Sequence, residues 1–141
     1  MQRSLEPPRP RVLVADDDAT IVELLMTRLE LGGYSCFSAR DGYQAMARLY
    51  EVRPVAMILD INMPRLDGFG VLRAMRQADQ TCRVATMVLT ARNQSTDVQE
   101  ALRLGARDYM AKPFDDQVLL QRVARLVRKP KPVPEPVSLL I

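Results

Sequence analysis

The feature that most constrains the fold of this chain is a series of short apolar runs, each followed by a segment with helical periodicity. Val12–Ala15 and Val55–Leu59 are apolar at every position. A strand that is apolar throughout is buried on both faces, which is typical of a parallel sheet with helices on each side. Because the crossovers between parallel strands are right-handed, the pattern predicts a doubly wound α/β fold.

Five such β-α units fit between residues 11 and 129. The strands are predicted at Val12–Ala15, Tyr34–Ser38, Val55–Leu59, Val84–Leu89 and Tyr109–Ala111. Apolar residues spaced three and four apart predict a helix after each strand. The first helix has Ile21, Leu24, Leu25 and Leu29 on one face. The fourth contains Val98, Ala101 and Leu102, and the fifth contains Val118, Leu119, Val123, Leu126 and Val127. Gly32-Gly33 and Gly105 are expected to end two of these helices.

The two ends of the chain differ from this body in composition. Seven of the ten prolines lie within the first ten residues and within residues 130–141. Proline at every second position excludes helix and favours an extended, polyproline-like chain. We therefore expect a flexible arm over residues 1–10, a folded domain over residues 11–129, and a Pro-rich extended tail or linker over residues 130–141.

Length and composition limit the classes of protein that this chain can represent. A length of 141 residues suits one domain with its own core. No apolar run approaches the roughly 20 residues that span a membrane, and the first ten residues lack the apolar region of a signal peptide. Cys36 and Cys82 are far apart in the sequence, so a reduced, cytoplasmic protein is the simplest interpretation.

The net charge of +3 comes from the ends of the chain. Residues 12–119 carry 12 basic and 15 acidic side chains, so the body is mildly acidic. We therefore expect no nucleic-acid partner for this chain alone. The basic ends fit an ordinary solvated surface, although binding of a phosphate or a partner is also compatible with them.

Polar residues follow four of the predicted strands. Asp16-Asp17-Asp18 follows the first strand, Asp60 the third, Thr90 the fourth and Lys112 the fifth. In open α/β sheets the ligand crevice lies outside the carboxyl ends of the strands. The sequence thus brings carboxylates, a hydroxyl and an ammonium to one crevice.

These residue types suit phosphoryl transfer. Crowded carboxylates repel one another, and a hard cation with oxygen ligands such as Mg²⁺ neutralises them. An aspartate can act as the nucleophile and form an acyl phosphate. Because phosphoryl transfer needs mainly positioning and neutralised charge, Lys112 and the cation meet the second requirement.

The segments VLVADDD, ILDINMPRLDG, MVLTA and YMAKPF resemble, in order and spacing, the motifs of the receiver domains of two-component response regulators. The resemblance covers nearly all of residues 11–129 and implies a (βα)5 flavodoxin-like sandwich with strand order 2-1-3-4-5. It also implies that Asp16, Asp17, Asp60 and the backbone carbonyl of Asn62 bind a metal ion. Asp60 would accept the phosphoryl group, and Thr90 and Lys112 would contact it. Thr90 and Tyr109 would act as the switch residues, and the peptide bond between Lys112 and Pro113 would be cis.

The implied function is a phosphorylation-dependent switch. Such a domain is a phosphoacceptor that assists its own phosphoryl transfer and dephosphorylation, and not an enzyme in the ordinary sense. Its expected partners are a sensor histidine kinase or phosphotransfer protein, a downstream protein target, and a second copy in a phosphorylation-dependent homodimer. Docking is expected on the face formed by the fourth helix, fifth strand and fifth helix.

Three other functions compete with this one. An aspartyl-phosphate phosphohydrolase needs a second acid two residues after its nucleophile, where this chain has Asn62. A pseudo-receiver scaffold would not need the complete set of acids, threonine and lysine. The chain is also compatible with a receiver fragment of a longer transcriptional regulator of the winged-helix class, although Arg107 stands where that class often has an acid.

Several residues have simpler structural interpretations. Asp18 is expected to cap the first helix, and Asp67-Gly68 to form a turn. Tyr109 could be plain core packing. The remaining residues of this kind are expected to fill the core without chemistry: Met57, Met75, Met87, Cys36 and Cys82.

Overall fold

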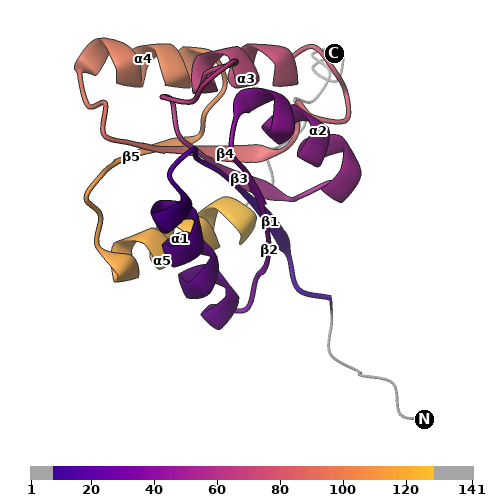
Figure 1. Ribbon diagram of the computed structural model, residues 1–141, viewed down its shortest axis with the longest axis vertical. Coiled ribbons are helices and arrows are strands. Elements are labelled where there is room, and N and C mark those ends of the chain that lie inside the picture. The colour runs from indigo at the N-terminus through magenta and orange to yellow at the C-terminus, as the bar shows by residue number, and fades with distance from the viewer. Residues whose placement is uncertain (1–7, 129–141) are drawn as a thin grey trace, which may run out of the picture.

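The computed structural model describes residues 8–128 as a five-stranded parallel sheet with helices on both faces (Figure 1). The expectations for residues 1–7 and 129–141, which include most of the N-terminal arm and the whole Pro-rich tail, lie outside the described residues. The elements in chain order are β1 (Arg11–Ala15), α1 (Ala19–Leu31), β2 (Ser35–Ala39), α2 (Gly42–Val52), β3 (Ala56–Leu59), α3 (Gly68–Met75), β4 (Ala85–Thr90), α4 (Ser95–Arg103), β5 (Asp108–Ala111) and α5 (Asp116–Arg128).

The strand order is β2-β1-β3-β4-β5, and all neighbouring pairs are parallel. The order predicted from the sequence is therefore confirmed. From β1 the chain passes to β2 on one side, and from β2 it crosses over β1 to β3 on the other side. The topological switch point therefore lies between β1 and β3. All five carboxyl ends point to the same edge of the sheet, where a ligand crevice is expected.

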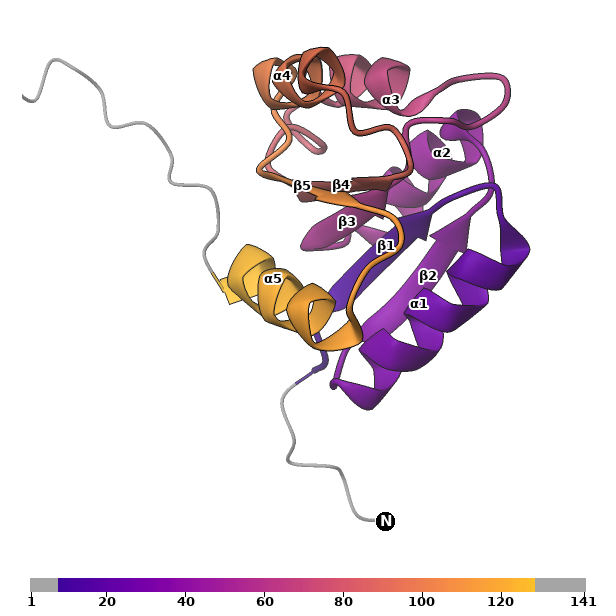
Figure 2. The same ribbon diagram turned by 90° about the vertical axis from the view of Figure 1, so that its left-hand side faces the viewer.

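Two hydrophobic cores lie on opposite faces of the sheet. Helices α1 and α5 cover one face, and α2, α3 and α4 cover the other (Figure 2). Side chains alternate along each strand, so Val12 and Val14 belong to the α1/α5 core whereas Leu13 and Ala15 belong to the other. This is why the central strands are apolar at every position.

Some predicted positions differ from the structure. Val55 lies outside β3 and is 46% exposed, although its amide still donates a hydrogen bond to the carbonyl oxygen of Arg11. Leu24, Leu102 and Val118 belong to the apolar patterns that predict the helices, but the structure leaves all three exposed. In α1 the buried face runs through Val22 instead, because a spacing of three or four residues fixes a face only to within one position around the helix.

Aspartates cap four of the five helices. Asp18 accepts hydrogen bonds from the first turn of α1, as predicted, and Asp41, Asp67 and Asp115 do the same for α2, α3 and α5. Helix α4 is the exception, because its N-cap residue Gln94 makes no side-chain hydrogen bond to the helix. The start of α4 therefore lacks a contact that stabilises the other four by typically about 1 kcal/mol.

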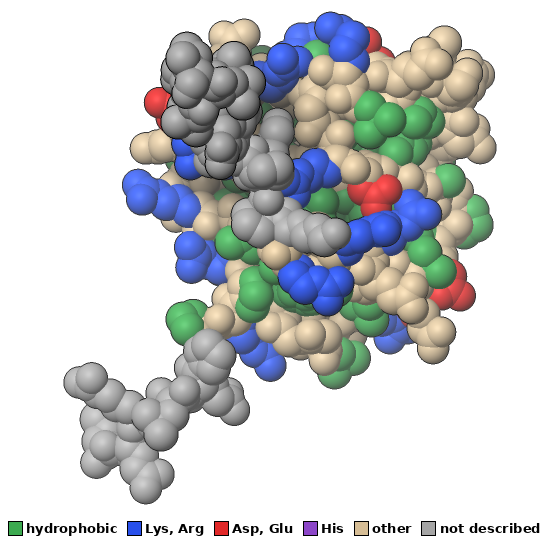
Figure 3. All heavy atoms as spheres, turned by 180° about the vertical axis from the view of Figure 1, so that it is seen from behind, with side chains coloured by type: hydrophobic (Ala, Val, Ile, Leu, Met, Phe, Trp, Pro, Cys, Tyr) green, Lys and Arg blue, Asp and Glu red, His purple; other side chains and the backbone are tan. Residues whose placement is uncertain are grey.

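The part of the chain that the structure describes contains two free cysteines and no helix that could span a membrane. No helix within residues 8–128 has the length and apolar character needed to cross a bilayer. On the face seen from behind, hydrophobic side chains form separate patches between arginines and other polar groups (Figure 3). Both cysteines are free, and burial, followed by the field of Glu30, raises the pKa of Cys36 to about 11, in agreement with an unreactive thiol.

Gly68 lies unusually close to the backbone at the end of β3. A Cβ atom at this position would lie 2.4 Å from the carbonyl oxygen of Asp60 and 2.8 Å from the Cα of Ile61. Its amide donates a hydrogen bond of 2.8 Å to the carbonyl oxygen of Ile61. Gly68 therefore allows α3 to begin directly against the segment that carries Asp60, a role that its interpretation as a simple turn missed.

We predict that Gly68→Ala lowers the free energy of unfolding by about 1–3 kcal/mol, because the rigid backbone of Asp60 and Ile61 must move. The matched control is Gly70→Ala in the same helix, where the closest contact, 2.4 Å, is with the side-chain tip of Leu66. That tip can rotate, so the control should change stability by less than about 1 kcal/mol. Urea unfolding of both variants measures the difference, and equal losses would contradict this account.

Candidate functional site

Three carboxylates meet at the carboxyl edge of the sheet. Asp16 and Asp17 follow β1, and Asp60 follows β3, the neighbouring strand. One oxygen from each lies within 4.8 Å of the other two. Asp16 is 2% exposed and Asp60 6%, whereas Asp17 is exposed at the rim. The predicted acidic cluster is therefore present in the structure.

Lys112 supplies the positive charge of this cluster. Its Nζ lies 2.7 Å from Oδ2 of Asp16 and 3.2 Å from Oδ2 of Asp60. The other oxygen of each carboxylate accepts a backbone hydrogen bond, from the amide of Asp18 and the amide of Asn62 respectively. Each buried carboxylate thus has one backbone donor and one charged donor.

The pKa values reflect this balance. Burial raises the pKa of Asp16, and the hydrogen bond from Lys112 opposes the rise without cancelling it. Burial acts to lower the pKa of Lys112, but the hydrogen bond from Lys112 to Asp16 and the charge of Asp60 outweigh it, so that pKa is raised. Lys112 is consequently held as an ammonium.

The donor set fits a hard divalent cation. Carboxylate oxygens are the preferred ligands of Mg²⁺, which keeps several waters and usually binds only a few protein groups together with a phosphate oxygen. Asp16, Asp17 and Asp60 provide such a half-open set, since two of the carboxylates are buried and one faces solvent. The backbone carbonyl of Asn62 remains a predicted ligand.

Thr90 lies beside Lys112 at the end of β4. It is completely buried, and its carbonyl oxygen accepts a 2.9 Å hydrogen bond from the amide of Lys112. Its hydroxyl oxygen accepts from the amide of Arg92 at 3.3 Å. The peptide bond between Lys112 and Pro113 is cis, as the resemblance implied.

Tyr109 sits on β5, next to β4, and is half-buried. Its hydroxyl donates a hydrogen bond to the carbonyl oxygen of Arg92 in the β4–α4 loop. Burial, with the nearby charge of Asp97, raises the pKa of Tyr109. The ring also packs against the core that α2, α3 and α4 cover, so core packing and a specific polar contact coexist at this residue.

Sequence reasoning missed Arg92. Its guanidinium lies 2.7 Å from Oδ1 of Asp97 and 3.3 Å from Oδ1 of Asn62. Asn62 lies 30 positions and Asp97 five positions from Arg92 along the chain, and no local sequence pattern predicts either contact. The amide of Asn62 also occupies the position where a phosphohydrolase of the competing class would need an acid.

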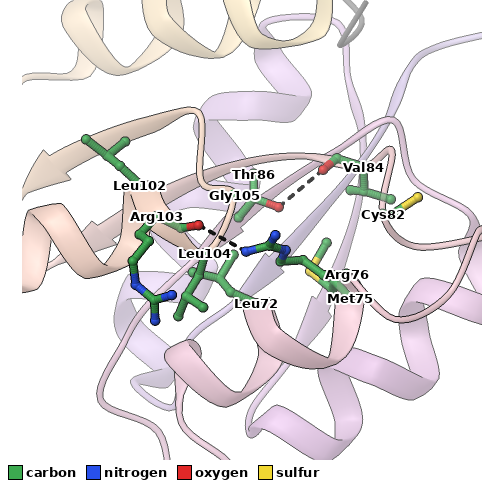
Figure 4. A pocket seen from close by; sticks show the side chains of 10 residues that line it. All are labelled: Leu72, Met75, Arg76, Cys82, Val84, Thr86, Leu102, Arg103, Leu104 and Gly105. Carbon is green, nitrogen blue, oxygen red and sulfur yellow. Dashed lines mark hydrogen bonds between the residues drawn. The ribbon is translucent and has the colours of Figure 1, made fainter. Parts of the chain in front are cut away.

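A separate pocket of about 350 Å³ lies near the amino ends of the strands, between α3, β4 and the end of α4 (Figure 4). Leu72, Met75 and Thr86 line it, and Arg76 donates a 3.0 Å hydrogen bond across it to the carbonyl oxygen of Arg103. It contains no carboxylate. It therefore takes no part in the cluster at the opposite edge of the sheet.

Comparison with known proteins agrees with this arrangement. The family model described as the response regulator receiver domain matches residues 12–124. The chain belongs to the response regulator receiver family. Receiver domains of this family are phosphoacceptor signalling domains of two-component systems and not classical enzymes.

Curated relatives include longer regulators. The chain is 43% identical over 120 residues to the transcriptional regulatory protein PrrA of Mycobacterium leprae, covering 85% of this chain and 51% of that protein. It is 36% identical over 126 residues to the DNA-binding dual master transcriptional regulator RpaA of Synechocystis sp., covering 89% and 52%. The chain thus spans about half the length of these curated relatives.

Solved receiver structures match the fold over nearly their whole length. The chemotaxis protein CheY4 of Vibrio cholerae superposes with a TM-score of 0.80 at 30% identity, covering 84% of this chain and 99% of that one. The receiver domain of the Francisella response regulator 1452 gives 0.79 at 32% identity, covering 85% and 98%. These matches confirm the CheY-like flavodoxin fold.

The exposed position of Asp17 yields a prediction about metal. Asp17→Ala should weaken Mg²⁺ binding roughly tenfold or more, because a site with few protein ligands depends on each carboxylate. It should also raise the melting temperature of the metal-free receiver, because it removes one of three mutually repelling charges. Titration calorimetry and thermal unfolding measure the two effects.

The control is Asp18→Asn, which removes a neighbouring charge while keeping a side chain that caps helices well. It should leave Mg²⁺ affinity close to that of the parent. A metal-free melting temperature of Asp17→Ala equal to or below that of the parent would contradict the electrostatic part of this account.

Proposed function

We propose that this receiver is a phosphorylation-dependent switch in which Asp60 accepts the phosphoryl group in the presence of Mg²⁺. The observation that carries the proposal is the position of Lys112, whose Nζ bridges Asp16 and Asp60 at 2.7 and 3.2 Å. This contact holds the acceptor carboxylate beside a fixed cation and next to the acidic pair.

In the proposed reaction a carboxylate oxygen of Asp60 forms a bond to phosphorus, and the bond between phosphorus and the donor breaks. The donor leaves with its electron pair, as the histidine of a sensor kinase or as a small carboxylate such as acetate. Mg²⁺, when bound, supplies charge neutralisation for the phosphoryl oxygens. Lys112 is placed to hold one phosphoryl oxygen, and the hydroxyl of Thr90 to donate to another.

The proposed output is a change in the face formed by α4, β5 and α5. If Thr90 turns its hydroxyl toward the phosphoryl group, the new charge-assisted hydrogen bond is worth about 1.5–3 kcal/mol, or a shift of about ten- to a hundredfold between two states. The ring of Tyr109 can then rotate into the space behind Thr90. The same face carries an ion pair of 3.2 Å between Arg122 and Asp108, which a partner or second copy would meet.

The partners belong to the same proposal. They are a sensor histidine kinase or phosphotransfer protein upstream, a protein target downstream, and a second copy of the chain in a phosphorylation-dependent homodimer. We further infer a cytoplasmic location. The curated relatives are about twice as long as this chain. If the chain is the receiver part of such a transcriptional regulator, it would pass its signal to a following domain. As a receiver alone it would act on a separate target.

Phosphorylation by acetyl phosphate and Mg²⁺ should add one phosphoryl group to the parent, and Asp60→Asn should abolish this. The amide is a poor nucleophile and removes the negative charge that orients Lys112. The matched control is Asp79→Asn, an exposed acid away from the site, which should label like the parent. Intact-mass analysis measures the labelling, and a labelled Asp60→Asn would disprove the assignment.

Thr90→Ala should still accept phosphate, more slowly, but should respond weakly to it. The control Thr90→Ser keeps the hydroxyl and should retain most of the response. The measurement is sedimentation, or affinity for the partner, with and without beryllofluoride, which stands for the phosphoryl group. If Thr90→Ala switches as fully as the parent, the proposed route through Thr90 is wrong.

A further inference from the structure

The pocket between α3, β4 and the end of α4 combines an apolar lining with positive charge (Figure 4). Its volume of about 350 Å³ falls within the range of about 300–1,000 Å³ that small-molecule sites occupy. Leu72, Met75 and Leu104 supply apolar lining, and all three side chains are buried. A hydrocarbon group placed against them would be removed from water, which favours binding.

Arg76 brings a positive charge to this lining without an acid to neutralise it. Its Nη1 donates a 3.0 Å hydrogen bond to the carbonyl oxygen of Arg103, which uses one of the five N–H groups of the guanidinium. Among residues 8–128, no ion pair includes Arg76. The guanidinium therefore keeps further donors for an anion in the pocket.

Two more arginines surround the pocket. Arg103 lines it, and Arg73 lines an adjoining hollow that shares Arg76 and Leu104 with it. Glu100 lies 2.8 Å from Arg103 and 4.0 Å from Arg73. Within the described part of the chain, the three cations thus have one carboxylate partner between them, and the charge around the pocket suits an anionic ligand.

Thr86 adds a buried hydroxyl to the wall of the same pocket. Its side chain is 1% exposed, and the alternation along β4 places it with Val88 on the face that α2, α3 and α4 cover. The hydroxyl donates a 3.4 Å hydrogen bond to the carbonyl oxygen of Val84. Hydroxyl donors are typically about 2.7–2.8 Å from their acceptors, so a ligand oxygen could offer Thr86 a better one.

We propose that this pocket binds a small amphipathic carboxylate, with its hydrocarbon body against Leu72, Met75 and Leu104 and its carboxylate on the guanidinium of Arg76. The apolar lining selects a ligand with a hydrocarbon body. A planar guanidinium fits a planar carboxylate through paired hydrogen bonds. The inference does not depend on the proposed phosphorylation, because the pocket shares no residue with the carboxylate cluster.

The test uses the metal-free protein with octanoate as the ligand. Octanol and inorganic phosphate each lack one half of the chemistry of octanoate, so each should bind at least about tenfold more weakly. Arg76→Met should weaken octanoate binding about tenfold and leave octanol binding unchanged. The matched control is Arg83→Met, which removes an exposed arginine that does not line this pocket from the loop between α3 and β4, and it should bind like the parent. Titration calorimetry measures all four affinities.

Cys82 reports directly on occupancy, because it lines the pocket and is one of the two cysteines in the chain. Octanoate at ten times its dissociation constant should slow alkylation of Cys82 by up to about tenfold, since the empty fraction falls by that factor. Cys36 packs against the core on the opposite face of the sheet, so its alkylation rate should not change. Mass spectrometry of the labelled peptides measures both rates.

A second variant, Thr86→Ile, leaves Arg76 and its contact with the end of α4 in place. It adds apolar volume to the wall of the pocket and removes the hydroxyl, and isoleucine suits a strand. Because the pocket becomes smaller, octanoate and octanol should both bind about tenfold more weakly or worse. This variant separates loss of the pocket from loss of the charge.

Octanoate binding that protects Cys82 and weakens in both variants supports the proposal. Octanoate that binds no more tightly than octanol or phosphate overturns it, as does binding that neither variant changes. If octanoate does not bind and Arg76→Met only lowers the melting temperature, the role of Arg76 is to hold the end of α4, and the pocket is not a carboxylate site. None of these results bears on the assignment of Asp60.

Discussion

The contact of one ammonium with two buried carboxylates is the constraint on which the rest of this structure depends. Burying a charge is costly unless it is paired and hydrogen-bonded, and Asp16 and Asp60 meet both conditions through Lys112 and a backbone amide. The three residues follow three different strands. They meet only if β1, β3 and β5 are parallel and in this order, so the sheet and the charge cluster require each other.

The fold and most of the site were predictable because each depends on local signals. Apolar runs mark buried strands, helical spacing marks the crossovers, and the strand that a residue follows decides which edge it reaches. Asp16, Asp17, Asp60 and Lys112 were therefore predicted together, and the structure brings them together. The errors at Leu24, Leu102 and Val118 have one cause, since the rotation of a helix on its sheet depends on tertiary packing.

What the sequence could not predict are contacts between segments that no periodicity relates. Gly68 is needed at the start of α3 because a Cβ atom at this position would lie 2.4 Å from the carbonyl oxygen of Asp60. In the sequence, however, Asp67-Gly68 looks like an ordinary turn. Its signal was present in part, since an Asp before a helical pattern is a typical cap. Arg92 gave no signal, because arginine after a strand is common on surfaces and its partners Asn62 and Asp97 come from other elements.

The two cations of the site are suited to different tasks. Lys112, the one lysine among residues 8–128, is a compact charge on a flexible stem and fits between two carboxylates, whereas the planar fork of Arg92 can bridge two acceptors in different elements. Both meet at Thr90. The amide of Lys112 donates to the carbonyl oxygen of Thr90, and the amide of Arg92 to its hydroxyl oxygen. Lys112 also contacts Asp60 directly, and Thr90 connects the backbone of Lys112 with the backbone of Arg92. In the proposed switch, a phosphoryl group at Asp60 would act on Thr90 and through it on the loop that leads into α4, whose N-cap residue Gln94 makes no side-chain hydrogen bond to the helix.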